Sequence, residues 1–518
     1  MNTGDVARAT HHNGGTVTAP LVPLPAVVQT ADAAGFHLVP TTTVSGPGDA
    51  RAALAEVVRR RTGITLTTAS DADIVLDIEP GGAPESYRLR VDAASVSIVG
   101  ADAAGLFYGM QTLAQLITHD TGDWSIPAAR IDDAPRFGYR GVMLDVARHF
   151  QPVATVFAFI DRAASLKFNM LHLHLTDDQG WRLQMDSRPL LTERASSTSV
   201  GGDAGGFYTK ADYRAIVEYA AERHMTVVPE VDLPGHTHAV GVAYPDIAEP
   251  PVMTDEIRDA IAQFGGEDPR AAVPYEGLAV GFSSLRIRDE RTYEFVADVL
   301  GELAALTPGP YLHIGGDEAL GTAAGDYADF MERATQIVDA LGKTPLTWHE
   351  AGAVDDLHDA TVGQYWGFVS PTDGMDERAR RFVRNGSRVI LSPADAVYLD
   401  MKPTADADLG LTWANGPTSV ERAYRWEPTA VIDGIGEDDI LGIEAALWTE
   451  TIRDLADLDR MAFPRIAAAA EASWSPRDGA DRTWTCFRER VGGLAPLWHS
   501  LGIGFDESAE IPWQKGRP

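Results

Sequence analysis

The sequence of 518 residues contains a single cysteine, Cys486, and little positive charge. One cysteine can form neither an intrachain disulfide nor a thiolate metal cluster, which fits a reducing compartment. The net charge is −32, whereas binding to nucleic-acid phosphates requires a basic surface. We therefore expect no nucleic-acid partner, and a well-solvated acidic surface is the simplest explanation of the charge.

Long apolar runs are also missing. No stretch approaches the roughly 20 apolar residues that span a membrane as a helix. The first 15 residues lack the basic segment and the apolar core of a secretory signal peptide. The sequence thus predicts a cytoplasmic protein without a membrane partner, or a secreted one if a signal has been removed from it. It leaves the oligomeric state open and is compatible with a monomer.

The N-terminal part of the chain mixes short β-rich runs with helical ones. Residues 1–17 are polar and rich in glycine, which predicts a disordered lead. Residues 18–133 are predicted to form a small α+β domain, in which Asp102 caps a helix. The expected elements are strands at 73–78, 86–91 and 95–99, helices at 51–62 and 103–117, and an exit linker at 131–136.

From Tyr139 onward, short apolar strands alternate with amphipathic stretches. Eight such strands predict an α/β fold, a (β/α)8 barrel over residues 134–505, followed by a C-terminal tail at 506–518. A doubly wound open sheet is the alternative, but no glycine-rich phosphate fingerprint follows the first strand. The expected strands are 141–146, 170–175, 226–231, 311–314, 345–348, 361–365, 388–391 and 441–447, and the clearest helices are 153–166, 210–224, 327–341 and 455–470.

Polar residues gather directly after these predicted strands. The loops at the C-terminal ends of barrel strands build active sites, and stability alone gives no reason to collect acids and tryptophans there. The sequence therefore predicts an active site at this end of the barrel. The clusters lie at 145–150, 177–181, 230–238, 315–318, 348–350, 366, 392–400 and 448–450.

The most informative segment is His-Ile-Gly-Gly-Asp-Glu at residues 313–318. In a regular strand Asp317 and Glu318 would point to opposite faces, but in a glycine turn at a strand end both can face one pocket. Two acids in different environments can hold different protonation states, as acid–base chemistry requires. A glycine turn followed by an acidic helix cap is the alternative interpretation.

Six motifs with polar or aromatic residues, one of them the segment at 313–318, follow one another along the chain. They lie at 140–150, 167–182, 229–236, 313–318, 398–400 and 447–450. Among them are Thr-Asp-Asp-Gln-Gly-Trp (176–181), Pro-Glu-Val-Asp-Leu-Pro-Gly-His (229–236) and Trp-Thr-Glu (448–450). Together they resemble glycoside hydrolase family 20, the β-N-acetylhexosaminidases, over about residues 139–475. Residues 18–133 resemble the small α+β domain that often precedes this barrel.

The resemblance implies catalysis assisted by the substrate, with retention and without an enzyme nucleophile, a cofactor or a metal ion. It implies that Glu318 is the general acid and base, and that Asp317 orients the acetamido group and stabilises its developing positive charge. Tyr398 is implied to donate a hydrogen bond to the acetamido oxygen. The implied partner is an oligosaccharide or glycoconjugate that ends in a β-linked N-acetylhexosamine.

Aromatic residues are expected around the acetamido group, because its methyl needs an apolar wall. Trp348, Trp366 and Trp448 match the aromatic box of the family. Trp413 lies in a long loop and is expected at the sugar or at the entrance for the leaving group. Ordinary core packing is the alternative for each of them.

Charged residues are implied to hold the sugar hydroxyls. Arg148 matches the arginine that bonds O3 and O4, Glu450 the acid that shares O4, and Asp400 the acid that contacts O4 or O6. An ion pair between Arg148 and Glu450 without sugar contact is the alternative. A polar network, whose role is either catalytic or structural, is expected around the acid from Asp177, His236, Asp232 and His174.

Three other interpretations remain open. His172 and His174 lie on one face of a predicted strand and could bind zinc in a hydrolase of the same fold. A carbohydrate-binding protein without activity would have lost the acid, whereas Asp317 and Glu318 are both present. An enzyme that releases disaccharide units would differ only in the depth of the pocket. The sequence does not decide between N-acetylglucosamine and N-acetylgalactosamine or identify the natural glycan.

Overall fold

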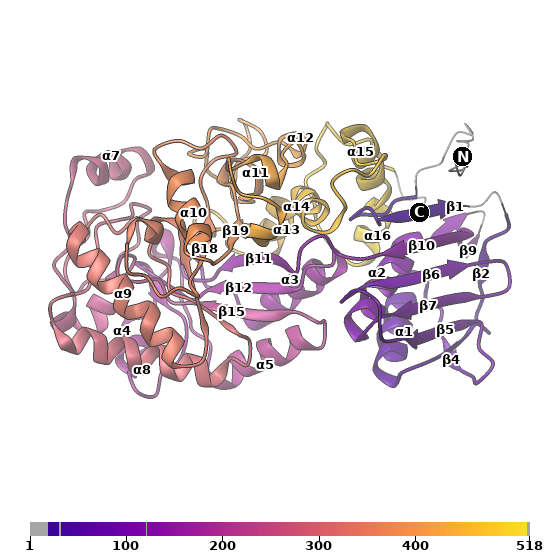
Figure 1. The fold of residues 1–518 in the computed structure, drawn as a ribbon, viewed down its shortest axis with the longest axis horizontal. Helices are drawn as coiled ribbons and strands as arrows, with labels where there is room; N and C mark the ends of the chain where they lie inside the picture. The colour runs from indigo at the N-terminus through magenta and orange to yellow at the C-terminus, as the bar shows by residue number, and fades with distance from the viewer. Residues whose placement is uncertain (1–18, 31–32, 121, 515–518) are drawn as a thin grey trace, which may run out of the picture.

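The computed structural model describes residues 19–514 apart from residues 31, 32 and 121. The disordered lead expected at residues 1–17 therefore lies outside the described residues. Figure 1 shows an open sheet with helices formed by the first part of the chain, next to a larger barrel formed by the rest. No helix among the described residues is both long and apolar enough to cross a membrane.

A seven-stranded mixed sheet forms the N-terminal domain, in the order β1-β10-β6-β7-β5-β3-β4, and β2, β9 and β8 form a smaller sheet beside it. Its helices are α1 (Gly48–Thr62) and α2 (Ala103–Leu116). The carboxylate of Asp102 accepts a hydrogen bond from the backbone N–H of Gly105, as expected of a cap. The strands are β1 (Val27–Thr30), β2 (Phe36–Leu38), β3 (Thr43–Ser45), β4 (Thr67–Thr68), β5 (Ile74–Ile78), β6 (Tyr87–Val91), β7 (Val96–Gly100), β8 (Thr118–Asp120), β9 (Asp123–Ile126) and β10 (Ala129–Asp133).

Side chains of this sheet alternate between a buried and an exposed face. In β6, Tyr87, Leu89 and Val91 are buried, while Arg88 and Arg90 are exposed. Helix α2 contacts β5, β6 and β7, so it covers the buried face. The expected small α+β domain is thus confirmed, with one sheet face packed and the other turned outward.

Eight parallel strands close into a barrel, and the last strand pairs back to the first. The predicted (β/α)8 fold is therefore confirmed, and each predicted strand begins and ends within two residues of the observed one. The barrel strands are β11 (Tyr139–Asp145), β12 (Met170–His174), β15 (Thr226–Glu230), β16 (Tyr311–His313), β17 (Thr344–Trp348), β18 (Val362–Tyr365), β19 (Val389–Leu391) and β20 (Ile440–Leu447), and a short hairpin follows β12, formed by β13 (Thr176–Asp177) and β14 (Gly180–Trp181).

Helices surround the barrel and return the chain between the strands (Figure 1). They are α3 (Val153–Ser165), α4 (Leu190–Ala195), α5 (Lys210–Ala221), α6 (His238–Ala243), α7 (Asp255–Phe264), α8 (Glu290–Leu306), α9 (Ala324–Ala340), α10 (Met375–Arg384), α11 (Ala394–Val397), α12 (Val420–Tyr424), α13 (Leu455–Ala462), α14 (Arg465–Trp474), α15 (Trp484–Gly493) and α16 (Ala495–Ser500), with 3-10 turns η1 (Val200–Gly202), η2 (Pro245–Ile247), η3 (His349–Ala353), η4 (Pro428–Ala430) and η5 (Glu437–Asp439).

Two predicted boundaries are wrong. The single helix expected at 455–470 is two helices, α13 and α14, separated at Phe463 and Pro464. Proline lacks a backbone N–H and its ring clashes with the preceding turn, so an α-helix ends before it. The linker expected at 131–136 is partly a strand, because β10 continues to Asp133, which pairs with Tyr87.

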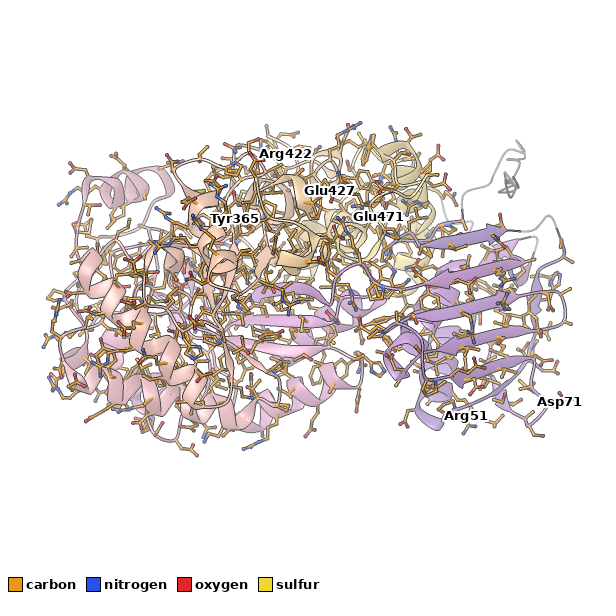
Figure 2. All side chains as sticks on the ribbon, in the orientation of Figure 1. Arg51, Asp71, Tyr365, Arg422, Glu427 and Glu471 are labelled. Carbon is orange, nitrogen blue, oxygen red and sulfur yellow. The ribbon has the colours of Figure 1, made fainter. Side chains whose placement is uncertain are left out.

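Buried polar contacts fix the small domain against the barrel. Lys167, which lies just before β12, contacts Asp133 at 3.0 Å, and both side chains are buried. Glu471 and Arg490 form another buried pair, and Arg490 also donates to the backbone oxygen of Leu21. Figure 2 shows Glu471 at this junction. The small domain thus packs at the N-terminal end of the barrel strands, opposite the end where the site is expected.

The C-terminal tail is packed as far as the structure describes it. Ile511 is buried, and the ring of Trp513 lies 4.7 Å from that of Phe505. The backbone N–H of Gln514 donates to the carbonyl of Gly492 at the end of α15. These contacts join residues 505–514 to the helices that follow the barrel.

Candidate active site

Asp317 and Glu318 follow β16 in a turn that depends on two glycines. Gly315 and Gly316 have φ values of 64° and 102°, which glycine adopts without steric cost. A Cβ on Gly315 would lie 1.7 Å from a carboxylate oxygen of Asp232, so no side chain fits there. Glu318 itself has a φ of 42°, which is uncommon for a residue with a side chain. The turn therefore places the two acids by a backbone path that a regular strand could not follow.

The imidazole of His236 lies between these two acids. Its Nε2 atom is 3.6 Å from an oxygen of Asp317 and 3.6 Å from an oxygen of Glu318. Its Nδ1 atom is 3.1 Å from Asp177. Asp317 and His236 are buried, whereas 38% of the Glu318 side chain is exposed. The acids share one site, and Glu318 is the one that faces open space.

The surrounding charges determine where the protons are. Burial raises the pKa of Asp317 above its usual value, and the charges of Glu230 and Glu318 add to this, although charged His236 opposes it. Burial and the charge of Asp317 raise the pKa of Asp232 well above its usual range. Burial lowers the pKa of His236, but the carboxylates around it outweigh burial and raise it well above its usual value. Both carboxyl groups of this pair thus have raised pKa values, and the charged imidazole of His236 lies beside them.

Asp177 connects His236 to Arg148 and to the barrel interior. One of its oxygens is 2.8 Å from Nη2 of Arg148 and 2.8 Å from Nε2 of His174. The Arg148 guanidinium also lies over the ring of Trp448, 4.7 Å from its centroid. Burial raises the pKa of Asp177, but Arg148 and His236 lower it well below its usual range. The cations on both sides hold this carboxylate ionised and in one orientation.

Glu230, at the end of β15, continues the network into the barrel. Its carboxylate lies 2.5 Å from Nδ1 of His174, 3.1 Å from Nε2 of His172 and 3.0 Å from Nδ1 of His313. It also accepts a hydrogen bond of 2.9 Å from the indole N–H of Trp348. One buried carboxylate therefore positions a tryptophan of the predicted aromatic box and the histidine that contacts Asp177.

The two histidines of β12, which the zinc interpretation would use as metal ligands, are paired with carboxylates. His172 is bonded on its other side by Glu444, at 2.8 Å. Burial lowers the pKa of His172, but Glu444 and Glu230 raise it to about 10; Glu230 and Asp177 likewise raise the pKa of His174 to about 9, against the effect of burial. The geometry therefore makes these two histidines ion-pair partners.

The predicted aromatic residues lie together on the C-terminal side of the barrel. The ring centroids of Trp348 and Trp448 are 6.0 Å apart, and those of Tyr398 and Trp448 are 6.2 Å apart. Trp413 lies 5.8 Å from Tyr398 and 5.9 Å from Trp366. Trp348, Trp448 and Tyr398 are buried, while 39% of Trp413 is exposed. Trp413 therefore occupies the open side of this aromatic cluster.

Asp400 and Glu450 are acids with oxygen atoms that the described residues leave without a partner. Both oxygens of Asp400 and Oε2 of Glu450 are buried and accept no hydrogen bond. Burial raises the pKa of Glu450 to about 7 and the pKa of Asp400 well above its usual range. Arg148 pairs with Asp145 and Asp177 and not with Glu450, which was the alternative for this cluster. Buried polar atoms are normally bonded, so these oxygens are available to a ligand.

Both parts of the chain match protein-family models. Residues 137–477 match the catalytic domain of glycosyl hydrolase family 20, and residues 18–134 match domain 2 of the same family. The chain belongs to glycosyl hydrolase family 20.

Relatives of this family 20 hydrolase cover nearly the whole chain. A β-N-acetylhexosaminidase of Cellulomonas fimi is 40% identical over 430 residues, which are 83% of this chain and 82% of that protein. The solved structure of a family 20 β-N-acetylglucosaminidase is 60% identical, with a TM-score of 0.90 and coverage of 96% and 100% of the two chains. The N-acetyl-β-hexosaminidase of Streptomyces plicatus in complex with thio-NAglucal is 41% identical, with a TM-score of 0.87 and coverage of 96% and 98%. The chain is accordingly a glycoside hydrolase of the β-N-acetylhexosaminidase type.

Two acids of this hydrolase site, Glu230 and Glu350, lie in the polar clusters predicted after the strands but were given no role of their own. Both Glu350 oxygens accept from the indole N–H of Trp366 at 3.0 Å, and burial and the charge of Asp317 raise the pKa of Glu350 to about 8. Their position at the ends of barrel strands is the signal that could have identified them. Sequence spacing does not reveal which indole or imidazole each carboxylate reaches, so their part in the site required the structure.

Proposed function

We propose that the protein is an exo-acting β-N-acetylhexosaminidase that removes terminal β-linked N-acetylhexosamine with retention, by substrate-assisted catalysis. The position of His236, 3.6 Å from both Asp317 and Glu318 beside the aromatic cluster, is the observation that carries this proposal. Asp317 is buried beside the charged imidazole of His236, whereas 38% of the Glu318 side chain is exposed. Two acids in such different environments suit two different tasks.

In the first step, Glu318 donates its proton to the glycosidic oxygen while the bond between that oxygen and the anomeric carbon breaks. The carbonyl oxygen of the substrate's own acetamido group forms the new bond to the anomeric carbon. This closes an oxazolinium ring whose nitrogen carries positive charge, and the Asp317 carboxylate stabilises it. The hydroxyl of Tyr398 donates to the acetamido oxygen and orients it for attack.

In the second step, a water molecule gives a proton to Glu318 and bonds to the anomeric carbon. The bond between that carbon and the acetamido oxygen breaks, and the ring opens. Each step inverts the anomeric carbon, so the product keeps the β configuration. Glu318 ends protonated and ready for the next cycle.

The remaining residues of the site bind the sugar. Trp348, Trp366 and Trp448 provide apolar walls for the acetamido methyl group. The unpartnered oxygens of Asp400 and Glu450 support a role as acceptors for sugar hydroxyls. Arg148, His236 and Asp177 hold the charges around the acids in place, with Asp232 and His174 behind them.

The test compares the wild type with Asp317→Asn on three aryl β-glycosides: the N-acetylglucosaminide, the N-acetylgalactosaminide and the plain glucoside. Substrate assistance requires an acetamido group, so the plain glucoside should not be cleaved. The variant should lose at least about 10²-fold in kcat on the N-acetylated substrates, the scale of losing one electrostatic stabiliser. The ratio of the rates on the N-acetylglucosaminide and the N-acetylgalactosaminide measures how strongly the enzyme discriminates between the two configurations at C4.

Cleavage of the plain glucoside at a comparable rate would mean an enzyme nucleophile and would overturn the role of Asp317. Circular dichroism and thermal unfolding of the variant provide the control, because Asn keeps the shape of Asp. If none of the three substrates is cleaved while a disaccharide-releasing substrate is, the pocket takes two sugars.

A further inference from the structure

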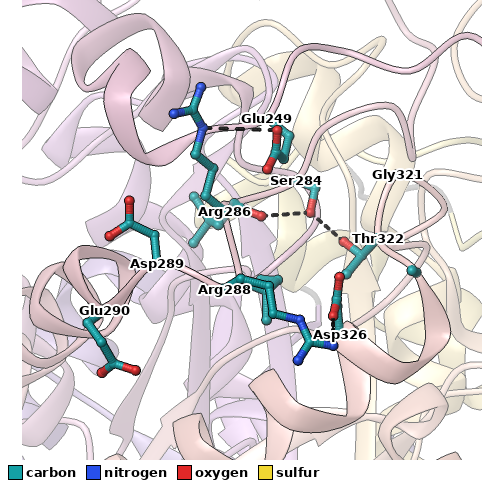
Figure 3. Close-up of a pocket in the computed structure, with 12 residues that line it drawn as sticks. Glu249, Ser284, Arg286, Arg288, Asp289, Glu290, Gly321, Thr322 and Asp326 are labelled. Carbon is teal, nitrogen blue, oxygen red and sulfur yellow. Dashed lines mark hydrogen bonds and ion pairs between the residues drawn. The ribbon is translucent and has the colours of Figure 1, made fainter.

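A polar cavity of about 400 Å³ lies between the N-terminal ends of α8 and α9. These helices follow barrel strands, so their first turns lie at the same end of the barrel as the catalytic turn. Figure 3 shows the side chains that line the cavity. They come from Glu249, from residues 284–290, and from Gly321, Thr322, Ala323 and Asp326.

The wall of this cavity begins close to the catalytic acid. Gly321 lines the cavity and follows Glu318 by three residues, a length of chain that spans roughly 10 Å at most. Between them, Leu320 packs on Gly281: a Cβ on Gly281 would lie 2.8 Å from Cδ1 of Leu320 and 3.0 Å from the backbone oxygen of Glu318. The two loop segments at 281–284 and 319–322 therefore run side by side from the acid.

These two segments are joined again at the cavity itself. The hydroxyls of Ser284 and Thr322 are 2.6 Å apart, as the dashed line in Figure 3 marks. A Cβ on Gly321 would lie 3.1 Å from backbone oxygens of residues 282 and 283, so the segments approach closely there. The surface from Glu318 to the cavity is thus one continuous path.

Charged groups in the cavity have capacity for further hydrogen bonds. Arg286 donates from Nε to the backbone oxygen of Ala248, and its Nε lies 4.0 Å from the carboxylate of Glu249. Within the described part of the chain, Nη1 and Nη2 of Arg286 and the Glu249 carboxylate have no hydrogen-bond partner. The two side chains are 41% and 50% exposed, so a ligand can reach them. A guanidinium and a carboxylate side by side suit the paired hydroxyls of a sugar.

An exposed apolar side chain lies on the way to the cavity. Leu320 is 58% exposed. In the described part of the barrel domain, the large apolar side chains that are exposed are Phe207, Val273, Leu320 and Trp413, and all four lie on loops that follow barrel strands. Leu320 therefore offers an apolar surface between the catalytic acid and the cavity.

We propose that this cavity is a distal subsite on the leaving side, which takes a reducing-side sugar of a β-linked oligosaccharide. The first leaving sugar, attached through the oxygen that Glu318 protonates, lies over Leu320, and the next sugar reaches Arg286 and Glu249. This inference depends on the proposed function, because it requires Glu318 to face the leaving group. It makes the enzyme selective for chain length: binding energy from a remote sugar increases kcat/KM.

The test measures kcat/KM for the wild type on N-acetylglucosamine oligomers of two, three and four β-linked units and on the aryl N-acetylglucosaminide. We expect a rise of about three- to tenfold between the dimer and the longer oligomers, the scale of one or two hydrogen bonds. Arg286→Ala and Glu249→Gln should each remove most of this rise. Arg380→Ala is the matched control, because Arg380 is a partly exposed arginine of α10 that does not line the cavity, and it should keep the full rise.

Equal kcat/KM for two, three and four units in the wild type would overturn the proposal, and so would a rise that survives both substitutions. Glu249→Gln keeps the side-chain shape, so a folding defect of Arg286→Ala does not leave the test undecided. If the aryl substrate is cleaved with the expected loss in Asp317→Asn but chain length has no effect, the distal subsite is wrong and the proposed function stands. If the aryl substrate is not cleaved, the proposed function itself has failed.

Discussion

Two groups of acids in the barrel domain differ in their partners. Glu230, Glu444 and Asp177, in and next to the barrel interior, are each bonded by histidine or arginine, and these cations lower their pKa values despite burial. Asp400 and Glu450, near the sugar-binding aromatic residues, have oxygens without partners, and burial raises their pKa values. The same residue types thus have pKa values shifted in opposite directions in the two groups.

This difference distinguishes acids that stabilise the structure of the site from acids that bind the ligand. A paired buried carboxylate is costly to expose and costly to leave without its partner, so the interior group holds the site in shape. An unpaired buried carboxylate destabilises the empty protein and is retained where a ligand supplies the missing partner. The two groups should therefore respond oppositely to neutral, isosteric substitution.

Glu230→Gln should give the largest effect. It removes the charge that His172 and His174 share and weakens the acceptor of the Trp348 indole, so we expect a loss of about 3–5 kcal/mol in the free energy of unfolding. Denaturant titration at pH 7 measures it. Glu290→Gln is the control, since Glu290 forms a surface pair with Arg333 and is 76% exposed, and it should change stability by less than about 1 kcal/mol. A loss in Glu230→Gln as small as in this control would contradict the structural role of the paired group.

Asp400→Asn should show the reverse pattern. The amide keeps the shape of the acid but accepts a weaker hydrogen bond from a sugar hydroxyl, so kcat/KM on the aryl N-acetylglucosaminide should fall about 10- to 100-fold, the scale of a hydrogen bond to a charged group. The free energy of unfolding should stay within about 1 kcal/mol of the wild type, because no partner in the protein is lost. Unfolding as severe as that of Glu230→Gln, with activity kept per folded molecule, would place Asp400 in the structural group.

Glu450→Gln should change the pH dependence of stability. Burial raises the pKa of Glu450 from an ordinary value of 4.5 to about 7 in the folded protein, so the folded state binds an extra proton between these pH values. Its contribution to stability is therefore fully present below pH 4.5 and is lost as pH rises to about 7. The glutamine does not titrate. The melting temperature of the wild type relative to the variant should thus decrease between pH 4.5 and 7, and parallel curves would mean that Glu450 ionises normally.

Much of the fold could be predicted because its signals are local. The eight barrel strands were recognisable as short apolar runs, and the Asp102 cap needed only the residue and the helix after it. The helix expected at 455–470 was wrong because apolar periodicity continues through Pro464, which breaks the backbone but not the pattern. The location of most predicted site residues in loops after barrel strands also followed from sequence, since barrel strands present their C-terminal ends to one side.

The pairing inside the site could not be predicted in this way. Glu230 reaches histidines from β12 and β16 and a tryptophan from β17, so its environment depends on the stagger of four strands. The sequence shows Glu350 two residues after Trp348. It does not show that Glu350 accepts a hydrogen bond from Trp366. The cavity at Arg286 joins segments about 40 residues apart, and nothing in either segment indicates the other.

The sequence by itself determined the barrel, the small domain before it and the presence of two adjacent acids after a glycine pair, because periodicity, turn chemistry and motif order are properties of neighbouring residues. The tertiary structure alone decided which acids are charged. Protonation depends on burial and on cations within a few ångströms, and these are set by residues that the fold brings together from distant parts of the chain.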